Sequence, residues 1–144
     1  MTTIRQILEG KGREIWFVSP DATVYDTIKL MADKNVGALV VLEGDQMRGI
    51  VSERDYARKV ILKGKSSKET LVEEIMSTDV VTIRPENSIE ECMALMTIKR
   101  IRHLPVLEKE KLVGMISIGD VVKAIISEKE FTIQQLENYI TGGR

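Results

Sequence analysis

An internal repeat constrains the fold of this chain more than any other feature of its sequence. When the sequence is displaced against itself by 65 positions, residues 18–57 align with residues 83–122 without a gap, and eleven of the forty pairs are identical. The identical pairs include a Gly-x-x-Ser-x-x-Asp pattern: Gly49/Gly114, Ser52/Ser117 and Asp55/Asp120. Because 144 residues are too few for two large domains, the repeat predicts two small units that share one body.

Each half has the same predicted order of elements. A short β-branched stretch, 16–19 or 80–83, leads to a proline, which disfavours continuation of a central strand. An amphipathic helix of about three turns follows, with Thr23 or Ser88 as a suitable N-cap. Two short strands separated by four polar residues then predict a hairpin, and a second amphipathic helix follows the Ser-x-x-Asp. The predicted unit is β-α-β-β-α, occurring twice.

The chain divides at polar stretches. We predict four segments: repeat 1 over 1–62, a linker over 63–70, repeat 2 over 71–126, and a C-terminal helix and tail over 127–144. "LVEEIM" resembles "IRQIL" near the N-terminus, so a short lead-in segment is also assigned to the repeat. In the tail, Phe131, Leu136 and Ile140 are placed near one face, and Gly142 is the expected helix stop. This face is expected to dock on the body or on a second copy.

Composition argues against several classes of function. The formal net charge is −1, so no overall field attracts nucleic acid, and only the basic cluster 99–102 could do so locally. One cysteine, Cys92, and one histidine, His103, supply neither a metal-ligand cluster nor a recognisable nucleophile-base pair. Charges near the N-terminus interrupt any signal-peptide core, and "VGALVVL" is too short to span a bilayer. We therefore expect a cytoplasmic, non-catalytic protein with no bound metal.

A duplicated β-α-β-β-α unit with Gly-x-x-Ser-x-x-Asp at its last strand-to-helix junction resembles a tandem pair of cystathionine-β-synthase (CBS) domains, called a Bateman module. The resemblance covers about residues 4–126, including "RIRHLPVL", and is closest to small stand-alone CBS-pair proteins. It implies an α/β (α+β) fold with two repeats packed sheet to sheet about a pseudo-twofold axis. Two clefts between such repeats commonly bind adenosine-containing ligands, and the modules usually pair into flat homodimers.

The junction residues suit a nucleoside. In the role that the resemblance implies, the ionised carboxylates of Asp55 and Asp120 accept hydrogen bonds from both ribose hydroxyls. Ser52 and Ser117 add a hydroxyl and backbone N–H groups at a helix start, and the two glycines allow close approach of the ligand. Ser-x-x-Asp at a helix start is also an N-cap with an acidic residue at the third helical position. Spacing alone therefore leaves capping and ribose binding both open.

The resemblance implies two clefts, each built from both repeats. The ribose and phosphate residues of cleft A are Gly114, Ser117, Asp120, Arg102 and His103. Its adenine wall consists of Phe17, Val18, Ser19, Pro20, Ala22, Val36 and Gly37. The ribose and phosphate residues of cleft B are Gly49, Ser52, Arg54, Asp55 and Arg58. Its adenine wall consists of Val81, Thr82, Ile83, Arg100 and Ile101.

The two clefts differ in positive charge. Arg102 and His103 favour a mononucleotide (AMP, ADP or ATP) in cleft A, whereas Gly37 and Ala38 occupy the matching positions of the first repeat. Cleft B lacks this pair. We therefore expect it to bind an adenosine ligand of another shape, such as NAD(H), or no ligand. Two alternatives stay open: the basic cluster 99–102 also suits a solvated helix end, and a lone histidine beside a strand is often structural.

These residues predict a regulatory module that binds adenosine-containing ligands. Occupancy of the clefts would rearrange the repeats or the homodimer and so alter contact with a regulated protein. The alternative is a ligand-independent module for dimerisation. Neither a membrane nor a nucleic acid is an expected partner, and no catalytic cofactor is expected.

Overall fold

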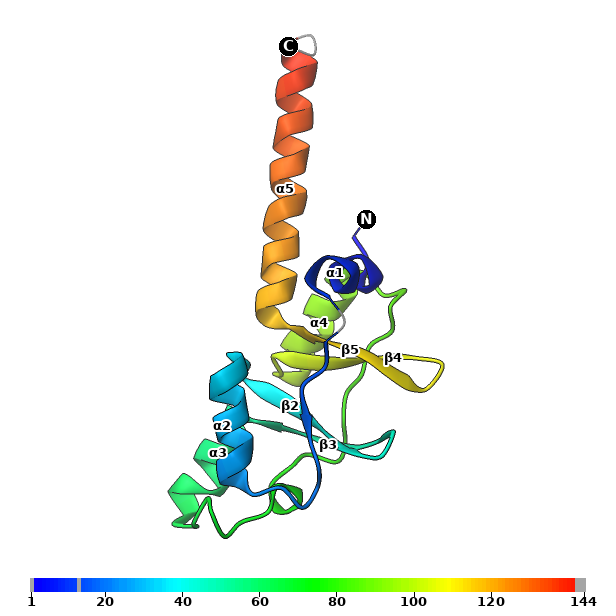
Figure 1. The fold of residues 1–144 in the computed structure, drawn as a ribbon. Helices are drawn as coiled ribbons and strands as arrows, with labels where there is room; N and C mark the ends of the chain where they lie inside the picture. The colour runs from blue at the N-terminus through cyan, green and yellow to red at the C-terminus, as the bar shows by residue number, and fades with distance from the viewer. Residues whose placement is uncertain (1, 13, 142–144) are drawn as a thin grey trace. The chain divides into compact units, whose positions relative to one another are not determined.

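The computed structural model describes residues 2–12 and 14–141 (Figure 1). The chain forms two compact units. The repeat-1 unit is Glu14–Val81, and the repeat-2 unit combines the N-terminal helix with the chain from Thr82 onward. No helix in the described ranges is both long and apolar enough to cross a membrane.

The repeat-1 unit contains a three-stranded sheet. Its elements are β1 (Phe17–Val18), α2 (Val24–Lys34), β2 (Ala38–Glu43), β3 (Gln46–Ser52), α3 (Glu53–Lys59), and the short 3₁₀ turns η1 (Ile61–Lys63) and η2 (Val72–Glu74). β1 pairs parallel to β2, and β2 pairs antiparallel to β3 as the predicted hairpin. The core of this unit consists of Val24, Met31, Leu39, Val41, Val51, Val60, Val72 and Ile75. Repeat 1 therefore has the predicted β-α-β-β-α order.

The repeat-2 unit contains a two-stranded sheet. Its elements are α1 (Ile4–Lys11), α4 (Ile89–Lys99), β4 (His103–Glu108), β5 (Lys111–Ser117) and α5 (Ile118–Ile140). β4 and β5 form the second predicted antiparallel hairpin. Its buried apolar residues are Ile4, Leu8, Ile83, Ile89, Cys92, Met96, Leu104, Val106, Ile116 and Val121. The mixed α/β fold with two repeats and a C-terminal helix is confirmed.

Helix starts follow the sequence prediction closely. The hydroxyl of Thr23 accepts a hydrogen bond from the Asp26 amide at the start of α2. Ser88 does the same for the Glu91 amide at α4, and the Glu91 side chain accepts from the Ser88 amide in return. Because these caps satisfy otherwise unpaired N–H groups, each contributes about 1 kcal/mol to helix stability. Both predicted N-caps are confirmed, and each helix has 11 residues, which is three turns.

The strand predicted at 80–83 is wrong. Only Ile83 contacts the sheet there, through an isolated parallel bridge to Val106. The Ile83 amide donates to the Pro105 carbonyl, and the Leu107 amide donates to the Ile83 carbonyl. The next bond along this ladder would need an N–H at residue 105, which proline lacks. In repeat 1 the residue equivalent to Pro105 is Val40, which has an N–H, and β1 pairs with β2 there.

Each lead-in segment packs on the other repeat. Residues 71–77 precede repeat 2 but pack on repeat 1, and α1 precedes repeat 1 but packs on repeat 2. The segment 71–77 runs against β3, where Ile50 and Ser77 exchange two backbone hydrogen bonds of 3.0 and 2.9 Å. α1 lies against β5 instead. The amides of Ile4 and Arg5 donate to carbonyls at 87 and 85, next to α4. The sequence repeats and the compact units therefore exchange their lead-in segments.

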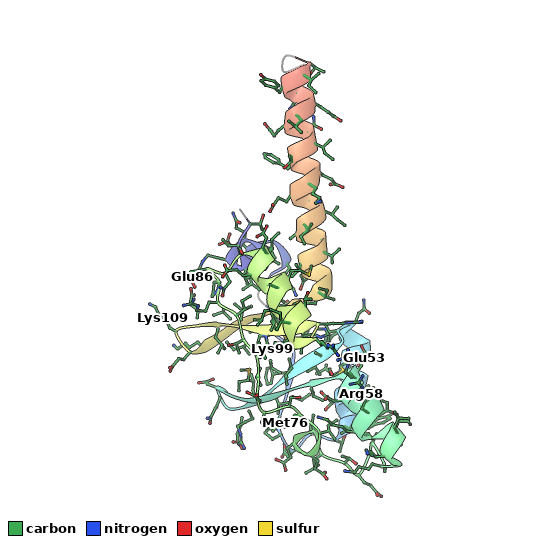
Figure 2. The ribbon with its side chains drawn as sticks, turned by 180° about the vertical axis from the view of Figure 1, so that it is seen from behind. Glu53, Arg58, Met76, Glu86, Lys99 and Lys109 are labelled. Atoms are coloured by element: carbon green, nitrogen blue, oxygen red, sulfur yellow. The ribbon has the colours of Figure 1, made fainter. Side chains whose placement is uncertain are left out.

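The two repeated glycines are packed against these segments. A Cβ at Gly49 would lie 2.7 Å from the Ser77 carbonyl oxygen and 2.9 Å from Sδ of Met76, which is labelled in Figure 2. A Cβ at Gly114 would lie 2.5 Å from Cδ2 of Leu8. Both glycines are buried within their strands. The close approach that each glycine permits in this structure is to the chain itself.

The C-terminal helix is continuous with repeat 2. α5 runs without interruption across the expected boundary at 126/127, because no glycine or proline occurs between Asp120 and Ile140. It is capped at Thr141. The predicted helix stop at Gly142 lies outside the described residues.

Candidate functional site

The Ser-x-x-Asp of repeat 2 forms a capping box at the start of α5. The Asp120 amide donates to Oγ of Ser117 at 3.2 Å, and the Ser117 amide donates to Oδ2 of Asp120 at 2.8 Å. β5 ends at Ser117, so the capping box fixes the carboxylate directly at the strand-to-helix junction. Capping, one of the two interpretations left open by the spacing, is confirmed here.

Repeat 1 has the same arrangement at the start of α3. The Asp55 amide donates to Oγ of Ser52 at 3.3 Å, and the Ser52 amide donates to Oδ2 of Asp55 at 2.9 Å. Each repeat thus holds its carboxylate by the same pair of bonds. Capping does not exclude ribose binding, because a carboxylate offers about four acceptor positions. The capping bonds of Asp55 use two of them, one for the Ser52 amide and one for the Ser52 hydroxyl.

The residues expected to hold phosphate in cleft A lie beside the repeat-2 capping box. His103 is the cross-strand neighbour of Ser117 at the end of the β4–β5 hairpin. The amide of Ile118 donates to the Arg102 carbonyl at 2.8 Å. Four predicted residues from two separate sequence segments therefore meet at one end of the hairpin: Arg102, His103, Ser117 and Asp120.

The equivalent junction of repeat 1 has no cation in the matching positions. Ala38 is the cross-strand neighbour of Ser52, and the Glu53 amide donates to the Gly37 carbonyl at 3.1 Å. The predicted residues Arg54 and Arg58 lie instead on α3, where both are exposed. The backbone geometry of the two junctions matches, so the side chains alone make them chemically different.

Asp120 has a cationic partner that the sequence analysis missed. Nζ of Lys11, at the end of α1, lies 2.7 Å from Oδ2 of Asp120 and donates to the Met115 carbonyl at 2.9 Å. Burial raises the pKa of Asp120, but the bonds from Lys11 and Ser117 and the charge of Lys11 together lower this pKa below its ordinary value. No spacing in the sequence connects residues 11 and 120, because the contact depends on how α1 packs.

Asp55 also has a lysine partner, from its own helix. Nζ of Lys59 lies 3.1 Å from Oδ1 of Asp55 and donates to the Ile75 carbonyl at 2.8 Å. This pair was not predicted from the sequence either, although its i,i+4 spacing is a recognisable helical signal. Both junction carboxylates are therefore paired with ammonium groups, one supplied locally and the other by a distant segment.

A hollow within the repeat-1 unit includes two residues of the predicted adenine wall of cleft A. The hollow, of about 240 Å³, lies between the end of α2 and the start of α3. It is lined by Ile28, Met31, Ala32, Asn35, Val36, Gly37 and Glu53. Sites for whole drug-sized ligands usually enclose about 300–1,000 Å³, so this hollow is smaller than such a site. Val36 and Gly37 belong to the predicted wall of cleft A.

The remaining wall residues lie in several positions. Phe17 is exposed on β1, with 54% of its surface accessible, and the wall of cleft A runs from there to Ala22. In the wall of cleft B, Arg100 caps α4 in the left-handed conformation at φ 56°. Ile83 is buried at its bridge to β4. Each cleft assignment combines residues of both compact units, so both clefts remain predictions.

Cys92 has a structural position. It is fully buried on α4, as predicted, and burial, with a smaller contribution from the charge of Asp120, raises the pKa of its thiol to about 11. At neutral pH the group is therefore a protonated thiol, which is a weak nucleophile. In the described ranges, no three His, Cys, Asp or Glu side chains gather in a way that could hold a metal ion.

The Lys11–Asp120 pair predicts a pH-dependent contribution to stability. A pKa lowered by folding gives stability that is present above the unfolded pKa, near 4, and is lost as the pH falls through the folded value. Because both side chains are partly exposed (38% and 22%), Lys11→Met should lower the free energy of unfolding at pH 7 by only about 1 kcal/mol.

Urea unfolding of both proteins between pH 2.5 and pH 7 measures this contribution. The difference between wild type and Lys11→Met should shrink as the pH falls below the unfolded pKa and then through the lowered pKa of folded Asp120. Lys29→Met, at an exposed position of α2, is the control and should show no such trend. A Lys11→Met difference that stays constant across the whole pH range would contradict the role of the pair.

Comparisons with known proteins agree with this architecture. The family model for the CBS domain matches residues 11–62 and 72–127. The mitochondrial CBS domain-containing protein CBSX3 of Arabidopsis thaliana is 45% identical over 152 residues, which cover 99% of this chain and 73% of that protein. The mitochondrial location belongs to that relative, and the cytoplasmic location expected for this chain stays a prediction.

Solved structures give the same result. A candidate signal-transduction protein with CBS domains from Burkholderia ambifaria is 56% identical, with a TM-score of 0.85 over 88% of this chain and 95% of that one. A hexameric CBS-CP12 protein from bloom-forming cyanobacteria is 33% identical, with a TM-score of 0.74 over 85% of this chain and 70% of that one. The repeated fold, the paired junctions and these matches lead to one conclusion: the chain belongs to the CBS-domain family and carries two CBS domains in tandem.

Proposed function

We propose that this protein is a regulatory module that binds adenosine-containing ligands at its Ser-x-x-Asp junctions. CBS-pair proteins are generally regulatory and ligand-binding, and CBS domains generally bind adenosine ligands. Stand-alone members like these relatives are typically non-catalytic. The observation that carries the proposal is the cluster at the repeat-2 junction, where an anchored, ionised Asp120 lies at the same hairpin end as Arg102 and His103.

Each part of a nucleotide has a chemically matched group in the proposed cleft A. The carboxylate of Asp120 accepts hydrogen bonds from the ribose hydroxyls. Arg102 and His103 supply donors for the phosphate, and an arginine can hold two phosphate oxygens at once. The hollow beside Val36 and Gly37 suits the flat apolar base.

Cleft B is proposed to have a different preference. Its Asp55 is anchored like Asp120, but Ala38 replaces histidine beside the capping box. Arg54 and Arg58 would have to supply the positive charge from the exposed side of α3. We therefore assign AMP, ADP or ATP to cleft A, and NAD(H), or no ligand, to cleft B.

Ligand binding is proposed to act through the arrangement of the two repeats. A nucleotide that contacts residues of both units would bind more tightly to one arrangement of the two repeats than to others. It would therefore increase the population of that arrangement. The resulting change would alter the homodimer or the contact with a regulated protein. No chemical step is needed for this function, and the nucleotide acts as a regulatory ligand rather than as a catalytic cofactor.

A ligand-independent dimerisation module is the second candidate. The observation that favours it is that both capping boxes are complete and both carboxylates already pair with a lysine. On this view the repeated motif serves helix stability alone.

Thermal unfolding with and without nucleotides distinguishes the two candidates. At a hundredfold excess over Kd, AMP, ADP, ATP or NADH should stabilise the protein by about 2.7 kcal/mol, which raises Tm by several degrees for a chain of this size. GMP and inorganic phosphate are the controls for the base and for the anion. If no adenosine compound shifts Tm and calorimetry detects no binding, the regulatory proposal is wrong and the second candidate is favoured.

A further inference from the structure

The distal half of α5 exposes apolar side chains that its own unit does not cover. Figure 1 shows this half of the helix extending beyond α1 and α4, and Figure 2 shows side chains projecting from it on all sides. Residues 129–141 are exposed, apart from the half-buried Asn138. An isolated helix of this length is only marginally stable in water, and exposed apolar residues at helical spacing indicate a packing partner.

Five of the exposed apolar residues of α5 form one stripe with heptad spacing, whereas Phe131 and Tyr139 lie outside it. Taking Ile126, Ile133 and Ile140 as positions a places Val122, Lys129 and Leu136 at positions d. The five apolar members of this stripe are between 43% and 80% exposed. The stripe lies roughly 100° around the helix from the body-facing Val121. It is therefore a coiled-coil seam without a partner in its own unit.

Phe131 is not part of this stripe. At about 100° per residue, it lies on the side of the helix opposite the seam, although it is 65% exposed. The sequence analysis placed Phe131 on the same face as Leu136 and Ile140, and helical geometry does not support that grouping. Phe131 is consequently a matched control position on the same helix.

We propose that the α5 seam of one copy pairs antiparallel with the α5 seam of a second copy. This inference concerns the exposed apolar stripe of α5 and does not depend on the proposed ligand. A self-complementary seam generates a closed twofold dimer, in which every contact occurs twice. In the register centred near residue 131, each a residue meets a d residue: Ile126 with Leu136, Ile133 with Lys129, and Ile140 with Val122.

The charges along α5 favour the antiparallel orientation, because its two Lys123–Glu137 pairs outnumber the single Glu130–Glu130 contact near the twofold axis. Lys123 and Glu137 both occupy position e, and in this register Lys123 of each copy faces Glu137 of the other. The stem of Lys129 covers Ile133 while its ammonium group reaches water at the edge of the seam. In a parallel, in-register pair the two Lys129 side chains would instead face each other at position d, where like charges are unfavourable.

The first experiment measures the mass of the full chain by sedimentation equilibrium across a range of concentrations. Wild type should be a dimer at tens of micromolar, and Ile133→Glu with Leu136→Glu should shift its dissociation constant at least tenfold toward monomer. Phe131→Glu adds a charge to an equally exposed apolar site of the same helix and should leave the dissociation constant unchanged. Circular dichroism of each variant verifies that the fold is retained.

The second experiment determines the orientation by disulfide formation. Glu130→Cys should cross-link two copies, because residue 130 of each copy lies close to the twofold axis in the antiparallel register. Leu136→Cys should not, whereas a parallel pair would reverse the two results. The native Cys92 is buried, so wild type serves as the background. A monomeric wild type, a dimer unaffected by the two glutamates, or cross-linking through residue 136 would each overturn the proposal.

Discussion

Gly49→Ala is expected to lower the free energy of unfolding by about 2–4 kcal/mol, which is a large effect for one added methyl group. The new Cβ would lie 2.7 Å from the Ser77 carbonyl oxygen. That oxygen is held by the Ile50 amide at 3.0 Å, and the Ser77 amide in turn donates to the Ile50 carbonyl. The backbone therefore cannot move away without loss of this pair of hydrogen bonds.

Urea unfolding of wild type and variants measures the effect, with an unchanged m-value as evidence that the same surface unfolds. Gly10→Ala is the matched control, because its Cβ would have no neighbour within 4 Å and it lies in α1. It should stabilise the protein by roughly 0.5–1 kcal/mol. Equal effects of the two substitutions would show that the close packing against Ser77 is not the reason for a glycine at 49.

Asp120→Asn is expected to weaken binding of the adenine nucleotide about ten- to a hundredfold while largely preserving the fold. Asparagine keeps one oxygen that can accept from the Ser117 amide, so the cap survives. It loses the charge and one acceptor for the ribose hydroxyls, and hydrogen bonds to charged groups are worth about 1.5–3 kcal/mol. Calorimetric titration gives the change in Kd.

Asp55→Asn is the matched variant in the other repeat. If the mononucleotide binds only in cleft A, Asp55→Asn should leave its Kd within about twofold, since contributions of separate sites are independent. Tm of each ligand-free variant separates binding from stability, because loss of the lysine pair alone should cost only a few degrees. Unchanged affinity in Asp120→Asn would show that Asp120 acts only as a cap.

Local structure could be predicted because its causes are local. Thr23 and Ser88 cap the helices that follow them, and four polar residues between apolar runs form both hairpins. The exception at 80–83 has a cause that is not local, because Pro105 on β4 lacks the donor that a second bridge would require. Pro105 can be read from the sequence. That it lies opposite residues 81–83 is known only from the strand pairing in the structure.

The candidate site was predictable only in part. The repeat identified Ser117 and Asp120, and the β4–β5 pairing places the predicted Arg102 and His103 beside them. Lys11 could not be foreseen, because its contact with Asp120 arises from the packing of a helix more than a hundred residues away in the sequence. Nothing in the sequence indicates that a lead-in segment preceding one repeat packs on the other repeat.

Periodicity, capping and turn chemistry act over a few residues, so the duplication, the β-α-β-β-α order of repeat 1 and the paired Ser-x-x-Asp junctions could be inferred from the sequence. Three features emerge only in the folded protein: the exchange of lead-in segments, the reason for glycine at 49 and 114, and the lysine at Asp120. These features depend on close packing between distant segments, where a single methyl group or ammonium group must fit a space that local patterns do not describe.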